Sequence, residues 1–261
     1  MEVFDQWPLG IWLALLGATA FAAVAHGAVG FGFPLLSTPL VALVTDVRTA
    51  VLTTLLPNIV INIISVLRGE GWLQTLRTYW PVAAWVFVGT LLGTAALAYA
   101  DPAALKVLLA AIIIVYLRQS RRRAAAGTPW RPGTRWGAAL FGTLGGFFSG
   151  TVNVAVPPLL IYFSALDLTP VALTQAMNLS FLVGRSTQVL ALASSGSMGA
   201  AWFVLGVPLT ALAVLSLAAG FRLQRRFPAQ TFVRLMRVLL WLMAATLLAQ
   251  VARALAGRYL R

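Results

Sequence analysis

The sequence of 261 residues contains no cysteine, a single histidine and only six acidic residues. The absence of cysteine excludes disulfide bonds, thiolate metal sites and cysteine catalysis. One histidine and six scattered acids leave little material for a metal site, so we expect neither a metal nor a cofactor. Charged residues make up 10% of the chain, whereas soluble domains contain roughly 25%. This composition is not that of a soluble metalloenzyme or a disulfide-stabilised domain.

Hydrophobic residues account for 60% of the chain. A soluble fold of this length could not bury so much apolar surface, whereas a membrane protein exposes it to lipid. The net charge of +13 would suggest nucleic-acid binding in a soluble protein. Lys and Arg are, however, enriched in the cytoplasmic loops of membrane proteins, and the sequence has no basic stripe with interleaved aromatics. We therefore predict the lipid bilayer as a partner, and no nucleic acid.

A membrane-spanning helix needs roughly 20 apolar residues, and apolar runs fill nearly the whole chain. The first two runs are almost continuous and are interpreted as one long, broken segment. The N-terminus is acidic, with Glu2 and Asp5, and lacks the basic region of a cleaved signal peptide, so the first run is expected to be retained. The runs are Pro8–Ala25, Gly27–Val44, Val47–Leu67, Tyr79–Ala100, Ala103–Leu117, Trp136–Phe163, Pro170–Ala193, Ala200–Phe221 and Thr231–Ala252.

The longest polar stretch, Arg118–Arg135, contains six arginines and divides the chain nearly in half. We predict a first membrane repeat over residues 1–117, a cytoplasmic arginine-rich linker over residues 118–135, and a second membrane repeat over residues 136–261.

The two repeats resemble each other in the order and spacing of their motifs. GFGFPLLSTPLVAL from Gly30 corresponds to GTVNVAVPPLLIYF from Gly150, and DVRTAVLTTLLPN from Asp46 corresponds to LTPVALTQAMNLS from Leu168. Internal duplication is common in transporters. The predicted fold is an all-α polytopic membrane protein with two related halves of four membrane segments each.

The first segment of each half is broken by glycine and proline, in Gly27–Pro34 and in Gly145–Asn153. Paired interruptions at matching positions are the best sequence indicator of a transporter's binding site. The physical reason is that non-helical backbone at membrane depth persists only beside a cavity or inside the protein. Backbone N–H groups released at Gly30, Gly32 and Gly150 would favour an anion.

Two topologies are compatible with these breaks. If each broken segment is a re-entrant hairpin, each half makes three crossings and the halves are inverted; thirteen Lys and Arg residues then lie inside and five outside. If each broken segment crosses fully, eleven lie inside and seven outside. The enrichment of Lys and Arg on the cytoplasmic side favours the hairpins modestly, and both topologies place the linker in the cytoplasm.

Arg185 is the one cation deep inside an apolar run. At 100° per residue it shares a helix face with Asn178 and Gln188. A charge at the centre of a membrane normally faces a cavity or a partner. One interpretation is a guanidinium that binds an anionic substrate. The alternative is a structural arginine that is satisfied by helix-end carbonyls or by an acid, although no acid lies at comparable depth.

Further polar residues lie within the apolar runs. In the first half, Asn58 and Asn62 share one face with Thr54 and Ser65, and they either line a cavity or join helices. Asn153 lies in the second break and is a similar candidate.

His26, just before the first break, is a candidate carrier of a coupling proton or a donor to an anion. The alternative is a neutral histidine that is bonded to loop backbone.

The chain resembles the TauE/SafE family of sulfite or organosulfonate exporters over nearly its full length. The resemblance rests on the two halves, the arginine-rich linker and the paired openings, which are Gly30-Phe31-Gly32-Phe33-Pro34 and Gly150 with Pro157-Pro158. Phe31 and Phe33 depart from the family's more glycine-rich opening. The resemblance implies transport of sulfite, sulfonates or related carboxylates across a bacterial inner membrane.

We therefore expect a secondary transporter that moves a small anion by alternating access around a midplane site. The family resemblance implies that the direction of transport is export. No G-x-x-x-x-G-K-[ST] motif for ATP is present. One alternative is an anion channel of the same architecture. Another is an intramembrane enzyme, which would need paired acids or a histidine with a carboxylate, whereas the acids all lie at segment ends. The sequence leaves the oligomeric state open.

Overall fold

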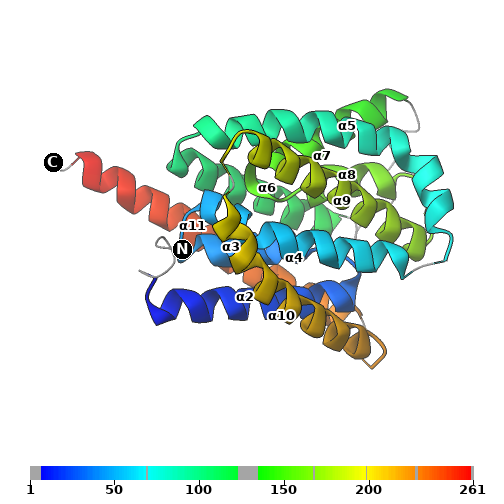
Figure 1. The fold of residues 1–261 in the computed structure, drawn as a ribbon, viewed down its shortest axis with the longest axis horizontal. Coiled ribbons are helices and arrows are strands. Elements are labelled where there is room, and N and C mark those ends of the chain that lie inside the picture. The colour runs from blue at the N-terminus through cyan, green and yellow to red at the C-terminus, as the bar shows by residue number, and fades with distance from the viewer. Residues whose placement is uncertain are drawn as a thin grey trace.

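The computed structural model describes residues 7–68, 70–122, 135–166, 168–197, 199–226 and 229–259, and these residues form α-helices without strands (Figure 1). The predicted all-α architecture is confirmed. The helices are α2 (Leu9–Val29), α3 (Phe33–Ala42), α4 (Val47–Leu67), α5 (Trp72–Tyr99), α6 (Pro102–Arg122), α7 (Arg135–Val152), α8 (Val156–Ser164), α9 (Pro170–Ser194), α10 (Ala200–Gln224) and α11 (Ala229–Tyr259).

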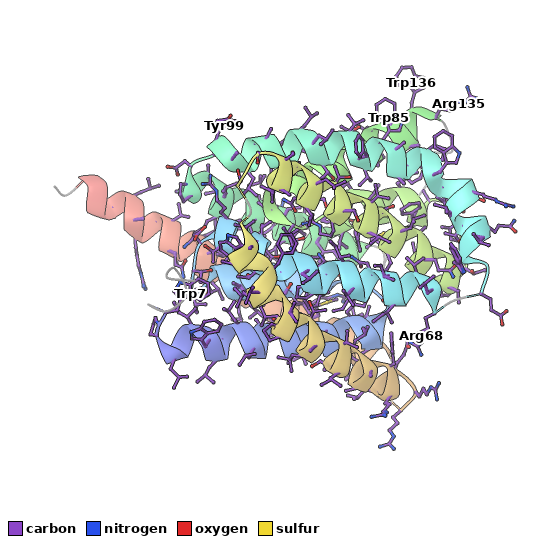
Figure 2. The ribbon with its side chains drawn as sticks, in the orientation of Figure 1. Trp7, Arg68, Trp85, Tyr99, Arg135 and Trp136 are labelled. Carbon is purple, nitrogen blue, oxygen red and sulfur yellow. The ribbon has the colours of Figure 1, made fainter. Side chains whose placement is uncertain are left out.

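Six of these helices are long and apolar enough to cross a membrane, namely α2, α4, α5, α6, α10 and α11. Large apolar side chains are exposed on their outer faces, for example Val207 and Leu215 of α10 and Leu242 of α11. Figure 2 shows Trp85 and Trp136 pointing away from the bundle. Because an apolar exterior is stable against lipid and not against water, the chain is an integral membrane protein.

Both predicted interruptions are present, but each is shorter than the sequence suggested. α2 continues through Gly27 to Val29, and the break comprises Gly30 to Gly32, where both glycines have positive φ (96° and 111°). α7 continues through Gly145 and Gly150 to Val152. The glycines within α7 remain helical because they lie against α5: a Cβ on Gly146 would stand 2.2 Å from the Val86 carbonyl oxygen.

The predicted linker is partly helical. α6 extends to Arg122 and α7 begins at Arg135, so the first residues of the stretch continue a helix. Residues 123–134, most of the predicted linker, lie outside the described residues.

One end of the bundle, here called the Arg48 end, is marked by polar contacts among four helices. The Arg48 guanidinium at the start of α4 donates to the carbonyls of Leu97 and Ala98 at the end of α5, both at 2.8 Å. Lys106 of α6 donates to the Gln250 side chain of α11 (2.7 Å), which donates to the carbonyl of Leu43, just after α3 (3.0 Å).

The opposite end, here called the Arg68 end, brings together other termini. Arg68, after α4, lies 3.6 Å from the ring centroid of Phe221 near the end of α10. Gln175 near the start of α9 accepts from Thr75 of α5 and donates to the carbonyl of Glu70. Figure 2 shows Arg68 at this end of the bundle.

The first helix of each broken segment packs against a helix of the other half. α2 crosses α10 at Gly27 and Gly220, near the Arg68 end, and α3 then leads back to Leu43 at the Arg48 end. α7 lies along α5, with Gly142 beside Val82 and Gly150 beside Thr90. Figure 1 shows α2 along one side of the bundle and α5 along the other.

α8 returns toward the Arg68 end after the second break. Its Leu159 lies against Gly145 of α7, and its Phe163 packs edge-on against Tyr79, 5.5 Å between ring centroids. α7 and α8 therefore form a folded-back pair within the bundle, as α2 and α3 do.

Candidate functional site

Asn153 is the centre of a buried hydrogen-bond cluster at the second break. Its φ of 62° is the left-handed conformation that asparagine tolerates better than most residues. The side-chain Nδ2 donates to Thr38 Oγ1 of α3 (2.8 Å) and to Thr54 Oγ1 of α4 (2.9 Å). The break thereby joins two helices of the first half.

The predicted polar face of α4 continues this cluster. Asn58 Nδ2 donates to Asn153 Oδ1 (3.2 Å), and Asn62 Nδ2 donates to Asn58 Oδ1 (2.9 Å). All three asparagines are buried. The structure therefore brings Asn58, Asn62 and Asn153 together near the middle of α4. Thr38 also belongs to the cluster and was missed from sequence, although a threonine within the apolar run PLLSTPLV was a usable signal.

Arg185 and Gln188 of α9 bind the last turn of α7. The Arg185 guanidinium donates to the carbonyl and hydroxyl oxygens of Ser149 and to the Gln188 side chain. Gln188 Nε2 donates to the carbonyl of Gly150 at 2.6 Å. The carbonyl of Ser149 also accepts from the backbone N–H of Asn153 (3.2 Å), and the last carbonyls of a helix carry partial negative charge. These are the contacts expected of a structural arginine that is satisfied by helix-end carbonyls. No carboxylate among the described residues accepts from Arg185.

His26 links the folded-back pair of α2 and α3, here called the first hairpin, to α4. Its Nδ1 accepts from the backbone N–H of Phe33 at the start of α3 (3.2 Å), and its Nε2 is 2.9 Å from Ser65 Oγ. Since Nδ1 accepts a hydrogen bond, the proton of the neutral ring is assigned to Nε2, which then donates to Ser65. Both ring nitrogens are used by the protein, and the side chain is fully buried.

Asn178 lies at the first break, and its hydrogen bonds are not to members of the Asn153 cluster. Its Nδ2 donates to the carbonyls of Gly30 and Thr174, both at 2.8 Å. The N–H of Gly30 closes the end of α2 by donating to the His26 carbonyl (2.7 Å). At both Gly30 and Gly150, the group that bonds a polar side chain is the carbonyl oxygen rather than the N–H predicted to attract an anion. Gly32 caps the start of α3.

Several buried polar atoms within the described residues have no hydrogen-bond partner. They are Ser37 Oγ, Asn62 Oδ1, Thr94 Oγ1 and Asn178 Oδ1. A buried polar group without a partner costs roughly 1–3 kcal/mol. Such groups at membrane depth are therefore sites where water or a transported solute can bind.

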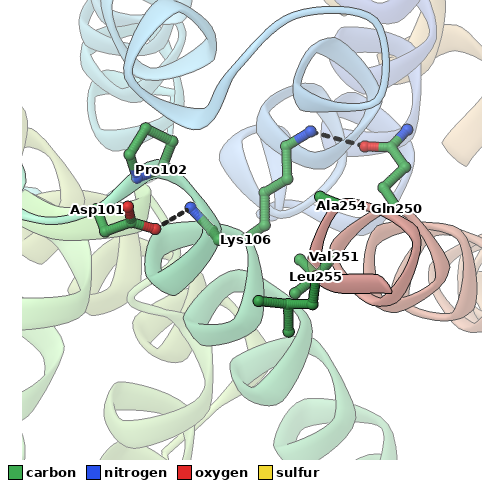
Figure 3. Close-up of a pocket in the computed structure, with 8 residues that line it drawn as sticks. Asp101, Pro102, Lys106, Gln250, Val251, Ala254 and Leu255 are labelled. Carbon is green, nitrogen blue, oxygen red and sulfur yellow. Dashed lines mark hydrogen bonds between the residues drawn. The ribbon is translucent and has the colours of Figure 1, made fainter. Parts of the chain in front are cut away.

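The described residues contain no group of three His, Cys, Asp or Glu side chains that could hold a metal ion. A surface pocket of about 270 Å³ lies at the Arg48 end, between the start of α6 and the C-terminal part of α11 (Figure 3). Asp101, Lys106 and Gln250 line it, and none of the predicted site residues does. The breaks and the helices around them, α4 and α9, therefore remain the candidate site.

The comparisons with known proteins agree with the resemblance. The family model described as "Sulfite exporter TauE/SafE" matches residues 15–247. No curated protein and no solved structure matches the chain significantly. The family is one of membrane transporters and not of enzymes. The match includes both breaks and both polar helices, so this chain belongs to the TauE/SafE family of sulfite exporters.

Proposed function

We propose that the protein exports a small anion, either sulfite, an organosulfonate or a related carboxylate, by alternating access around the two breaks. Membership of the family implies a membrane exporter of sulfite or sulfonates. The observation that carries the proposal is the buried guanidinium of Arg185 at the second break, which hydrogen-bonds to Ser149 and Gln188 and to no described carboxylate. An uncompensated cation at membrane depth attracts an anion strongly.

The polar residues around the breaks supply different kinds of contact. Arg185 would bind an oxyanion in the bidentate manner of a guanidinium, in exchange for its contacts with Ser149. The amide groups of Asn58, Asn62 and Asn153, together with those of Asn178 and Gln188, would donate to the remaining oxygens. Every one of these side chains is buried, so the binding site would open only when the surrounding helices move.

The packing of the two halves supports the proposal of inverted repeats. Asn58 of the first half bonds the second break, and Asn178 of the second half bonds the first break. In the same exchanged manner, α2 packs on α10 and α7 packs on α5. Two halves related by such an exchange can expose a central site alternately to either side. We assign the Arg68 end and the linker to the cytoplasm of a bacterial cell.

Coupling to a proton is a further part of the proposal, with His26 as the candidate. Protonation of Nδ1 would remove its hydrogen bond from Phe33 and loosen the first hairpin. We expect the export rate of the wild type to depend on pH, and that of His26→Gln to depend on it less. If both proteins transport at the same pH-independent rate, His26 does not carry a coupling proton.

Counterflow in proteoliposomes tests the function. Purified protein is reconstituted with a high internal concentration of unlabelled sulfite, and uptake of ³⁵S-labelled sulfite is followed. A transporter gives transient, saturable accumulation above equilibrium, whereas a channel or an empty liposome does not. We expect accumulation with the wild type and with Arg253→Gln, an exposed arginine of α11, and a loss of at least about tenfold with Arg185→Gln. Absence of counterflow with sulfite, sulfonates and carboxylates alike would overturn the proposal.

A further inference from the structure

Three arginines form one exposed cluster at the end of α10. Arg222, Arg225 and Arg226 are spaced at i, i+3 and i+4, which places them on one face of the helix end. They line a pocket of about 440 Å³ together with the smaller apolar side chains of Ala219 and Leu223. The lining of the pocket is thus cationic and partly apolar.

The positive charge of this pocket is not balanced within the described part of the chain. No described carboxylate forms an ion pair with Arg222, Arg225 or Arg226. Arg68 lies close by, over the ring of Phe221. Burial, and after it the neighbouring charge of Arg225, lower the pKa of Arg68. Four like charges at one helix end repel each other, so binding of an anion there would be stabilising.

The position of the pocket along α10 indicates which anion. α10 is one of the helices apolar enough to span a membrane, and it exposes large apolar side chains such as Val204, Val207 and Leu215 to the surroundings. The arginines follow directly after this apolar stretch, so a membrane spanned by α10 would have the phosphates of its lipid headgroups at their depth. Acyl chains would contact the apolar face of α10 while the phosphate contacts the guanidinium groups.

We propose that the pocket of Arg222, Arg225 and Arg226 binds the phosphodiester headgroup of an anionic phospholipid. Guanidinium groups bind phosphate oxygens through two parallel hydrogen bonds, and three of them can enclose one headgroup. The bound lipid stabilises the end of α10 next to Gly220, where α10 and α2 cross in close contact. It therefore stabilises the packing of the first hairpin on the second half.

A matched pair of variants distinguishes lipid binding at this pocket from a non-specific effect of arginine charge. The pocket variant is Arg222→Gln/Arg225→Gln/Arg226→Gln. The control variant is Arg77→Gln/Arg118→Gln/Arg234→Gln, which removes three exposed arginines of other helices that make no side-chain hydrogen bond in the described structure. Both variants lower the net charge by three, so non-specific electrostatics affects them equally.

Thermal unfolding of the delipidated, detergent-solubilised proteins is measured with added phosphatidylglycerol, phosphatidylcholine or inorganic phosphate, and bound lipid is counted by native mass spectrometry. At a lipid concentration about ten times its Kd, phosphatidylglycerol should raise the Tm of the wild type and the control variant by roughly 3–6 °C. The pocket variant should lose this shift and retain fewer bound phosphatidylglycerol molecules.

Three outcomes would overturn the proposal. An equal Tm shift with phosphatidylcholine and with phosphatidylglycerol would mean that the negative headgroup is not recognised. An equal loss in the control variant would mean that only total charge matters. A full shift with inorganic phosphate alone would mean that the pocket binds a soluble anion.

Discussion

The contacts of Arg185 with Ser149 are compatible both with a structural role and with the substrate-binding role proposed for it. Its hydrogen bonds to the oxygens of Ser149 complete the end of α7, and its charge remains without a described acidic partner. A guanidinium that rests on neutral oxygens can exchange them for the oxygens of an anion, because the charge-assisted bond is roughly twice as strong. A structural resting state and a substrate-binding state are therefore compatible in one residue.

Asn153 should be sensitive to substitution in a way that separates hydrogen bonding from backbone conformation. Asn153→Ala removes three hydrogen bonds. It also places alanine at φ 62°, where the Cβ atom is unfavourable and no polar side chain compensates. We expect the free energy of unfolding of Asn153→Ala to be lower than that of the wild type by about 2–4 kcal/mol. Asn153→Gly loses the same bonds without the strain, so it should be more stable than the alanine variant by about 1 kcal/mol. The Tm of each variant in detergent measures these effects. An Asn153→Ala variant with the Tm of the wild type would contradict the role of the cluster.

The candidate residues themselves could be predicted from sequence, because polar side chains within apolar runs are conspicuous. Arg185, Asn58 and Asn153 were found in this way. Their partners could not be predicted. Arg185 bonds a backbone carbonyl, for which no residue type is a signal, and Asn153 bonds residues about 100 positions away in the chain.

Glycine determines how closely the helices of the broken segments approach their partners. A Cβ on Gly93 would lie 2.2 Å from the Phe147 carbonyl oxygen, and one on Gly220 would lie 2.3 Å from that of Val24. Real side-chain contacts are never so short, so a larger residue must push α5 from α7, or α10 from α2.

Substitution of these glycines therefore has an internal control within α2. Gly93→Ala and Gly220→Ala should each lower stability by about 1–3 kcal/mol, since the backbone neighbours cannot rotate away. Gly17→Ala, where nothing lies within 4 Å of the new Cβ, should be neutral or stabilise by up to about 1 kcal/mol. Thermal melting in one detergent compares the three. Equal effects at all three positions would show that close crossing is not what these glycines provide.

The helices were predicted to within a few residues at most of their ends, because hydrophobic length and proline or glycine at the ends determine them. The breaks were predicted less well. The run of glycines in Gly145–Gly150 suggested an interrupted helix, but it forms a continuous one. A glycine that permits close packing and one that ends a helix look the same in a single sequence, and only the position of α5 distinguishes them.

Contacts between the two halves run through the whole molecule. The first helix of each half lies against the third long helix of the other half, and each break is bonded by an asparagine of the other half. The related sequences of the halves predicted duplication, but similarity within a chain does not reveal which half contacts which. Each half therefore contacts the other at both breaks.

Single cysteines can test the hairpin topology, since the chain has none of its own. Ser197→Cys, between α9 and α10, and Arg225→Cys, after α10, are exposed positions at opposite ends of α10. With inverted hairpins, a membrane-impermeant maleimide added to intact cells should label Cys at position 197 and not at position 225. Arg77→Cys is the cytoplasmic reference in both topologies. Labelling at 225 but not at 197 would show that the broken segments cross fully.

Binding of small anions to the purified protein tests the central proposal most directly. Thermal unfolding is measured for the wild type, Arg185→Gln and Arg253→Gln with sulfite, a sulfonate, a carboxylate and chloride at equal ionic strength. We predict that at least one of the first three anions, and not chloride, stabilises the wild type and Arg253→Gln, and that the shift disappears in Arg185→Gln. An equal shift in Arg185→Gln, or no shift with any anion, would show that Arg185 serves the structure of α7 alone.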